Sequence, residues 1–77
     1  MDTHNIHGIE VGFHSGTEGA HIFLNHEENR HMAQDYLKQA QEKGVAHFYD
    51  KNGEKFKIEH KLSEEGKSVF SVEKSHH

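Results

Sequence analysis

The chain has 77 residues, ten histidines, no cysteine and a formal net charge of −4 with the histidines neutral. This length allows one domain, and the lack of cysteine excludes disulfides and zinc–thiolate sites and fits a reducing cytoplasm. The acidic balance disfavours nucleic-acid binding, no apolar run approaches the ~20 residues of a membrane span, and the polar N-terminus does not resemble a signal peptide. We therefore expect a single cytoplasmic domain over residues 1–77.

Apolar residues alternate with polar residues or glycine in residues 9–13, and a similar alternation follows in residues 20–24, which predicts two strands. A loop at 16–19 would join them as an antiparallel hairpin, with both apolar faces on one side. Residues 1–7 carry no such pattern and are expected to be flexible, as are residues 75–77.

One helix is predicted after this hairpin. Asn25 is a good N-cap, Glu28 three residues later completes a pattern like a capping box, and Gly44 suits the left-handed residue that ends a helix. An apolar stripe at spacings of three, four and seven, with Met32 at its edge, consists of Ala33, Tyr36, Leu37 and Ala40. We expect this stripe to pack against the sheet.

Residues 45–50 and 55–62 are predicted to form a second hairpin. The Asn-Gly dipeptide at 52–53 favours a type I′ turn, because both central residues of that turn need a positive φ. Such a turn pairs Tyr49 with Phe56, which is a favourable aromatic pair across the strands.

A fifth strand is predicted over residues 68–74. The loop 64–66 before it would place Gly66 in the left-handed position of a type I turn with a bulge, and this register pairs His60 with Phe70. The fold class is therefore α+β: a two-layer ββαβββ domain with one amphipathic helix on one face of a mostly antiparallel five-stranded sheet. A right-handed crossover gives the strand order 2-1-3-4-5.

The uncovered face of this sheet is expected to carry aromatic rings beside histidines and lysines. Exposed aromatic patches usually mark protein interfaces. The candidate partner-binding residues are Phe23, Phe48, His14, His21 and Lys57. Two other interpretations remain open: Phe23 covers Gly12 on the opposite strand, or a one-residue slip of the second hairpin buries Phe48 and exposes His47.

His14 and His21 would lie directly opposite each other in the first hairpin, with Cβ atoms ~5 Å apart. They are therefore the candidate ligands of a divalent metal ion, although two imidazoles make only half of a zinc site. A solvated pair that titrates near pH 6 to 7 is the alternative. No cofactor is indicated.

Catalytic motifs are missing from the sequence, which has neither a Gly-rich phosphate loop nor a cysteine nucleophile. We expect a small non-enzymatic binding or regulatory module that contacts a protein partner, or a second copy of itself, through the uncovered sheet face or a sheet edge. A histidine-based metal-binding protein is the alternative, and a nucleic-acid-binding module is the third hypothesis.

Overall fold

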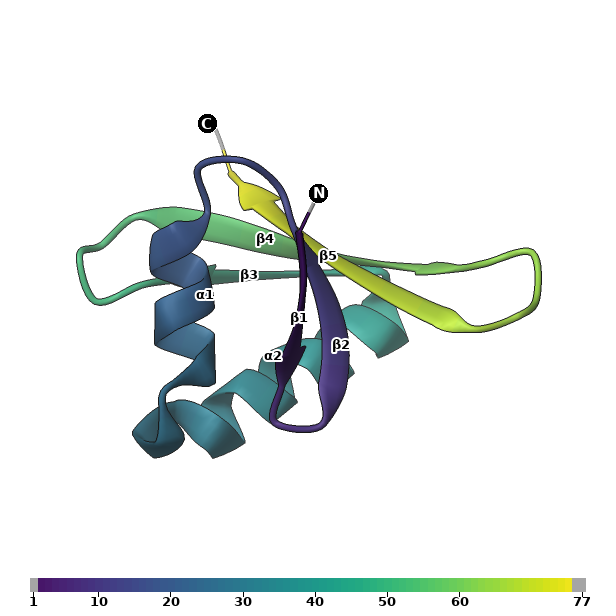
Figure 1. Ribbon diagram of the computed structural model, residues 1–77, viewed down its shortest axis with the longest axis horizontal. Coiled ribbons are helices and arrows are strands. Elements are labelled where there is room, and N and C mark those ends of the chain that lie inside the picture. Colours follow the sequence, from purple (N-terminus) through teal and green to yellow (C-terminus); the bar gives the residue numbers. More distant parts are fainter. Residues whose placement is uncertain (1, 76–77) are drawn as a thin grey trace.

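A computed structural model describes residues 2–75 and shows an α+β fold with two helices and a five-stranded mixed sheet (Figure 1). The elements are β1 (Asp2–Ile6), β2 (Ile9–Phe13), α1 (Glu18–Asn25), the short 3-10 helix η1 (Glu27–Asn29), α2 (Arg30–Lys43), β3 (Val45–Tyr49), β4 (Lys55–Leu62) and β5 (Ser68–Lys74). The strand order is β1-β2-β5-β4-β3, with β2 and β5 parallel and the other pairs antiparallel. The α+β class is confirmed, and the expected order 2-1-3-4-5 is wrong.

The sheet is strongly twisted, so that β1 and β2 cross the direction of β3 and β4 steeply (Figure 1). Among the described residues, neither α1 nor α2 is long and apolar enough to cross a membrane. The expectation of flexible ends also covers residues 1 and 76–77, which lie outside the described residues.

Residues 2–6 were expected to be flexible and instead form β1, an edge strand paired with β2. His7 and Gly8 make the turn between them with φ values of 51° and 93°. A type I′ turn needs positive φ at both positions, and histidine is one of the few non-glycine residues enriched there. The apolar pattern gave no sign of β1, because Ile6 is its only apolar residue.

Residues 18–25 form helix α1, so the expected strand at 20–24 is wrong. Ala20 and Leu24 are fully buried, and their separation of four places them on one face of a helix. Ile22, which the strand pattern directed toward the core, is 60% exposed. Five residues are too few to separate a period of two from a period of 3.6.

Helix α2 confirms the predicted apolar stripe and the predicted end of the helix. Ala33, Leu37 and Ala40 are buried against the sheet. Gly44 has a φ of 90°, and its N–H donates to the carbonyl of Ala40 at 2.7 Å.

The start of that helix differs from the prediction. The predicted N-cap, Asn25, is the last residue of α1, and the chain turns at His26 before α2 begins at Arg30. The Nδ1 atom of His26 accepts the N–H of Glu28 at 3.2 Å and caps η1.

The second hairpin adopts the slipped register, with Phe48 opposite Phe56, so the predicted type I′ register is wrong. Only Gly53 has a positive φ (80°) in the turn, as in a type I turn with a bulge. The Oδ1 atom of Asp50 accepts the N–H groups of Asn52 and Glu54, both at 2.9 Å. This carboxylate stabilises the longer turn and thereby moves the pairing by one residue.

The third hairpin has the predicted register, with His60 opposite Phe70 and Gly66 at a φ of 81°. Its far end projects from the rest of the sheet (Figure 1). Leu62 and Val69 lie exposed on this projecting end.

The core lies between the sheet and the two helices and centres on the ring of Phe48, which is 2% exposed. The centroid of this ring lies 6.1 Å from that of Phe23, 5.3 Å from that of Tyr36 and 5.6 Å from that of Phe56. Phe48 therefore joins α1, α2 and β4 through aromatic contacts.

Replacing Phe48 by alanine should lower the free energy of unfolding by about 3–5 kcal/mol, because it leaves a cavity where three rings meet. Tyr49→Ala is the matched control: the neighbouring side chain is 55% exposed, and its loss should cost less than about 1 kcal/mol. Urea unfolding followed by circular dichroism measures both. Equal losses in the two variants would contradict the register described here.

The turn makes a second prediction. Gly53→Ala should cost about 1–2 kcal/mol of stability, because alanine resists a positive φ, and no neighbouring atom lies within 4 Å of the added Cβ. Asn52→Ala should change stability by less than about 0.5 kcal/mol, since Asn52 does not have a positive φ. Thermal melting of both variants checks this, and a similar loss in each would instead favour a type I′ turn.

Candidate functional site

The predicted aromatic patch on the uncovered face is wrong. Phe48 is buried on the opposite side of the sheet, and Phe23 belongs to α1, where its ring packs against the core. Phe23 is only partly buried and also lines a groove of about 390 Å³ between α1 and the β3–β4 turn, beside the exposed Ile22. Of the two predicted rings, only Phe23 reaches a surface.

Lys57 lies on the uncovered face as predicted, within a network of ion pairs. Its Nζ atom lies 3.0 Å from a carboxylate oxygen of Glu73 and 3.8 Å from one of Glu59. The hydrogen bond to Glu73, and then the charges of both carboxylates, raise the pKa of Lys57 above its ordinary value. The same hydrogen bond lowers the pKa of Glu73. The charge of Lys57 is therefore balanced by carboxylates of its own chain.

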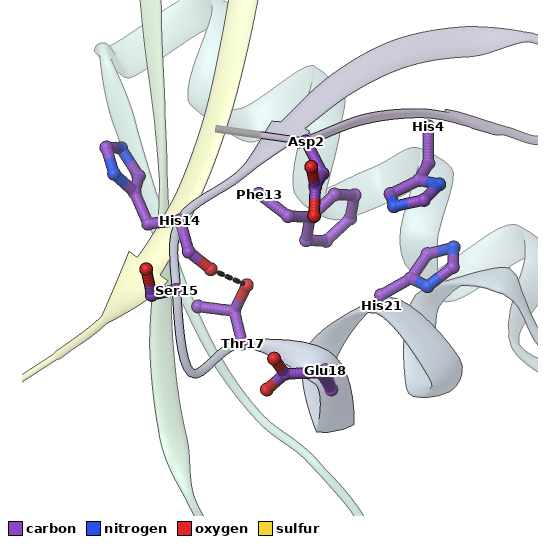
Figure 2. Close-up of a pocket in the computed structure, with 8 residues that line it drawn as sticks. All are labelled: Asp2, His4, Phe13, His14, Ser15, Thr17, Glu18 and His21. Atoms are coloured by element: carbon purple, nitrogen blue, oxygen red, sulfur yellow. Dashed lines mark hydrogen bonds between the residues drawn. The ribbon is translucent and has the colours of Figure 1, made fainter.

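Histidines gather at a cavity of about 220 Å³ between β1, the end of β2 and α1 (Figure 2). Its lining residues are Asp2, His4, Phe13, His14, Ser15, Thr17, Glu18 and His21. His14 and His21 both line this cavity, but they do not face each other across a hairpin, because His21 lies on a helix. The ring of His14 points away from the other two histidines (Figure 2).

His4 and His21 stack at the wall of this cavity. Their ring centroids are 4.0 Å apart with an interplanar angle of 20°, and the centroids of His21 and Phe13 lie 5.1 Å apart in an edge-to-face arrangement. Burial, and then the nearby His4, lower the pKa of His21 below its ordinary value. The pair thus joins β1 to α1 most strongly when the imidazoles are neutral.

The predicted position of His14 and His21 opposite each other in a hairpin is wrong, because His21 lies on α1 and the ring of His14 points away from it (Figure 2). Metal binding by these two residues stays a prediction. The stacked rings of His4 and His21 are nearly parallel, so their in-plane nitrogen lone pairs point side by side and not toward one ion. Within residues 2–75, no group of three or more histidine, aspartate or glutamate side chains is placed to hold a metal ion. The partnership of His4 with His21 could not be foreseen from the sequence, because residues 1–7 carried no strand pattern.

The two edges of the sheet are β1 and β3, and within residues 2–75 each pairs with one strand only. Both ends of the β3–β4 ladder are fixed by hydrogen bonds. The His60 N–H donates to the carbonyl of Gly44, and the Asp50 N–H donates to the carbonyl of Glu54, each at 3.0 Å.

Hydrogen-bonded and non-hydrogen-bonded pairs alternate along an antiparallel ladder. Ala46 and Phe48 therefore direct their N–H and C=O groups toward β4. The residues whose backbone groups point outward, away from the sheet, are Val45, His47 and Tyr49. The side chains of these three are exposed as well, Val45 at 36% and Tyr49 at 55%.

The edge at β3 lacks the usual protection. Proteins normally guard an edge strand with a charged residue, a proline or a bulge. The sequence of β3 is Val-Ala-His-Phe-Tyr, with none of these, and its pairing with β4 runs without interruption. The other edge, β1, is mostly polar and begins with Asp2, and the side chain of Asn5 accepts the N–H of Gly8 at 2.9 Å.

Comparisons of the chain with protein-family models, with curated proteins and with solved structures find no match. The open edge at β3 was missed from the sequence because the expected strand order placed residues 45–50 between two other strands, whereas the observed order places β3 at the end of the sheet. The alternation of Val45, His47 and Tyr49 with Ala46 and Phe48 was a signal for the faces of β3, but not for its place at the edge.

The His4–His21 pair predicts pH-dependent stability. The folded protein holds the pKa of His21 below its unfolded value of about 6.5, so the unfolded chain binds more protons in acid. The stability that the neutral His21 contributes should therefore be present above about pH 6.5. It should decline as the pH falls below the pKa of His21 in the unfolded chain toward its lower pKa in the folded protein.

Melting temperatures measured between pH 7.5 and 5.5 test this dependence. In His21→Gln the fall should be clearly smaller than in the parent protein, whereas His31→Gln, at an exposed position of α2, should retain the full fall. An unchanged pH dependence in His21→Gln would show that the His4–His21 pair does not cause the loss of stability in acid.

Proposed function

We propose that this chain is a small non-enzymatic module that binds a protein strand along the free edge of β3. The observation that carries the proposal is the unprotected edge itself. The backbone N–H and C=O groups of Val45, His47 and Tyr49 point away from β4, and their side chains are exposed on the uncovered face. In strand addition, main-chain hydrogen bonds supply the affinity, and alternate side chains supply the specificity.

The side chains beside this edge support the same role. Val45 and Tyr49 offer apolar surface at the two ends of β3, with His47 between them. On the neighbouring strand, Lys57 lies opposite His47, and Glu73 holds it there at 3.0 Å. An incoming strand would therefore meet two apolar residues around a polar centre, which is a pattern that can select its partner.

A proline at position 47 is the sharpest test. The N–H of His47 points outward, so His47→Pro should spare the hydrogen bonds to β4 while it removes a donor from the edge. Thr3→Pro is the matched control on β1: its N–H also points outward, because the two-residue turn makes Ile6 and Ile9 a hydrogen-bonded pair.

Immobilised parent protein should retain a partner from the lysate of its source, and the identified partner should then protect the amides of Val45, His47 and Tyr49 from hydrogen exchange. We expect His47→Pro to weaken that partner's binding by tenfold or more, and Thr3→Pro to leave it unchanged. Binding that survives His47→Pro, with protection at other residues, would contradict a role for β3.

A further inference from the structure

We propose that the strand added at β3 is β3 of a second copy, paired antiparallel about a two-fold axis at His47. This inference rests on the proposed function, because it names the partner of the same edge. The two sheets would become one continuous sheet, with β3 and its symmetry mate at the centre.

The edge is self-complementary in its backbone. The outward-pointing residues lie at positions 45, 47 and 49, symmetric about His47. An antiparallel copy centred there places Val45 opposite the partner subunit's Tyr49 and His47 opposite the partner subunit's His47. Every outward N–H then meets an outward C=O, because each of these facing pairs is of the hydrogen-bonded kind.

The side chains fit this register as well. Each Val45 would lie against the partner subunit's Tyr49 on the uncovered face, which is a favourable aromatic and β-branched pair. Both side chains are substantially exposed in the single chain, at 36% and 55%, so the pairing removes apolar surface from water. A shift of two residues along the partner strand would keep a two-fold axis, at position 46 or 48, but it would lose both of the symmetry-related pairs of Val45 with the partner subunit's Tyr49.

Charges near the axis do not oppose the pairing when the histidines are neutral. The groups that face His47 are Lys57, Lys55 and Glu59 on β4, Glu73 and Lys74 on β5, and His14 after β2. Lys57 is paired with Glu73 and Glu59, and Lys74 with Glu54 at 3.2 Å. The two histidines at the axis are thus the one place where like charges would meet directly across the interface after protonation.

The symmetry also limits the assembly. A two-fold interface uses the same patch on both copies, so it consumes both β3 edges, and association stops at a dimer. One strand pairing gives a small interface, at the low end of those that form specific complexes. We therefore expect a weak dimer whose population rises with protein concentration.

Sedimentation equilibrium of the purified chain over a wide concentration range at pH 7.5 tests the dimer. The parent protein and Thr3→Pro should shift from monomer to dimer with increasing concentration, and His47→Pro should remain monomeric with an unchanged circular dichroism spectrum. His47→Lys keeps the backbone donor and places two ammonium groups at the axis, so it should weaken dimerisation tenfold or more even if the proline variant misfolds.

Disulfide trapping tests the register. Because the chain has no cysteine, a single introduced cysteine can cross-link only to its own counterpart. His47→Cys should form a dimer rapidly under mild oxidation, since facing Cα atoms in this pair lie at ~5.5 Å. Val45→Cys should cross-link at least tenfold more slowly, because its counterpart lies four residues away along the strand, roughly 13 Å.

The outcomes separate this inference from the proposed function. A chain that stays monomeric at every concentration overturns the dimer, and the proposed function stands if a different protein protects the β3 amides. A dimer that persists in both His47→Pro and His47→Lys forms through another surface and also overturns the inference. Equal cross-linking of the two cysteine variants would show that the register is wrong.

Discussion

The carboxylate of Asp50 determines the arrangement on which the rest of this structure depends. Its Oδ1 atom accepts two backbone N–H groups of the β3–β4 turn, and the residue is 7% exposed. On the other side, a Cβ placed on Gly19 would lie 2.8 Å from its Oδ2 atom, so the first turn of α1 packs against the same carboxylate. The Asp50 side chain therefore selects the hairpin register. Helix α1 can pack against the same side chain because residue 19 is glycine and has no Cβ.

The register then assigns alternate residues of β3 either to the core or to the open face. Because successive side chains alternate, placing Phe48 in the core also places His47 on the open face, and backbone alternation turns the N–H and C=O of His47 away from β4. A shift by one residue would expose the ring that joins α1, α2 and β4, and it would bury a histidine. The stability of the core and the chemistry of the edge are thus fixed by the same choice of pairing.

Sequence patterns predicted the parts of the fold where local chemistry and tertiary packing agree. The α2 stripe from Ala33 to Ala40, the end of that helix at Gly44 and the third hairpin with Gly66 are of this kind. The predictions failed where a side-chain hydrogen bond within a turn, or the shortness of a segment, made the sequence pattern misleading. The Asp50 carboxylate overrode the Asn-Gly preference, and the alternation around Ile22 concealed a helix whose buried residues are four apart.

The candidate site could not be predicted without the strand order, which the sequence pattern did not determine and which places β3 at the edge. Lys57 was placed correctly because a one-residue slip in β3 leaves the faces of β4 unchanged, whereas Phe48 and His47 exchanged places. The β3 edge also shows why burial alone does not find such a surface: its side chains are single exposed residues of an ordinary kind. What distinguishes the edge is that its backbone donors and acceptors lie in one uninterrupted row beside apolar side chains. The alternation that creates this row keeps it apart from the core, so the association proposed for Val45, His47 and Tyr49 depends on residues other than Phe48, which holds the fold.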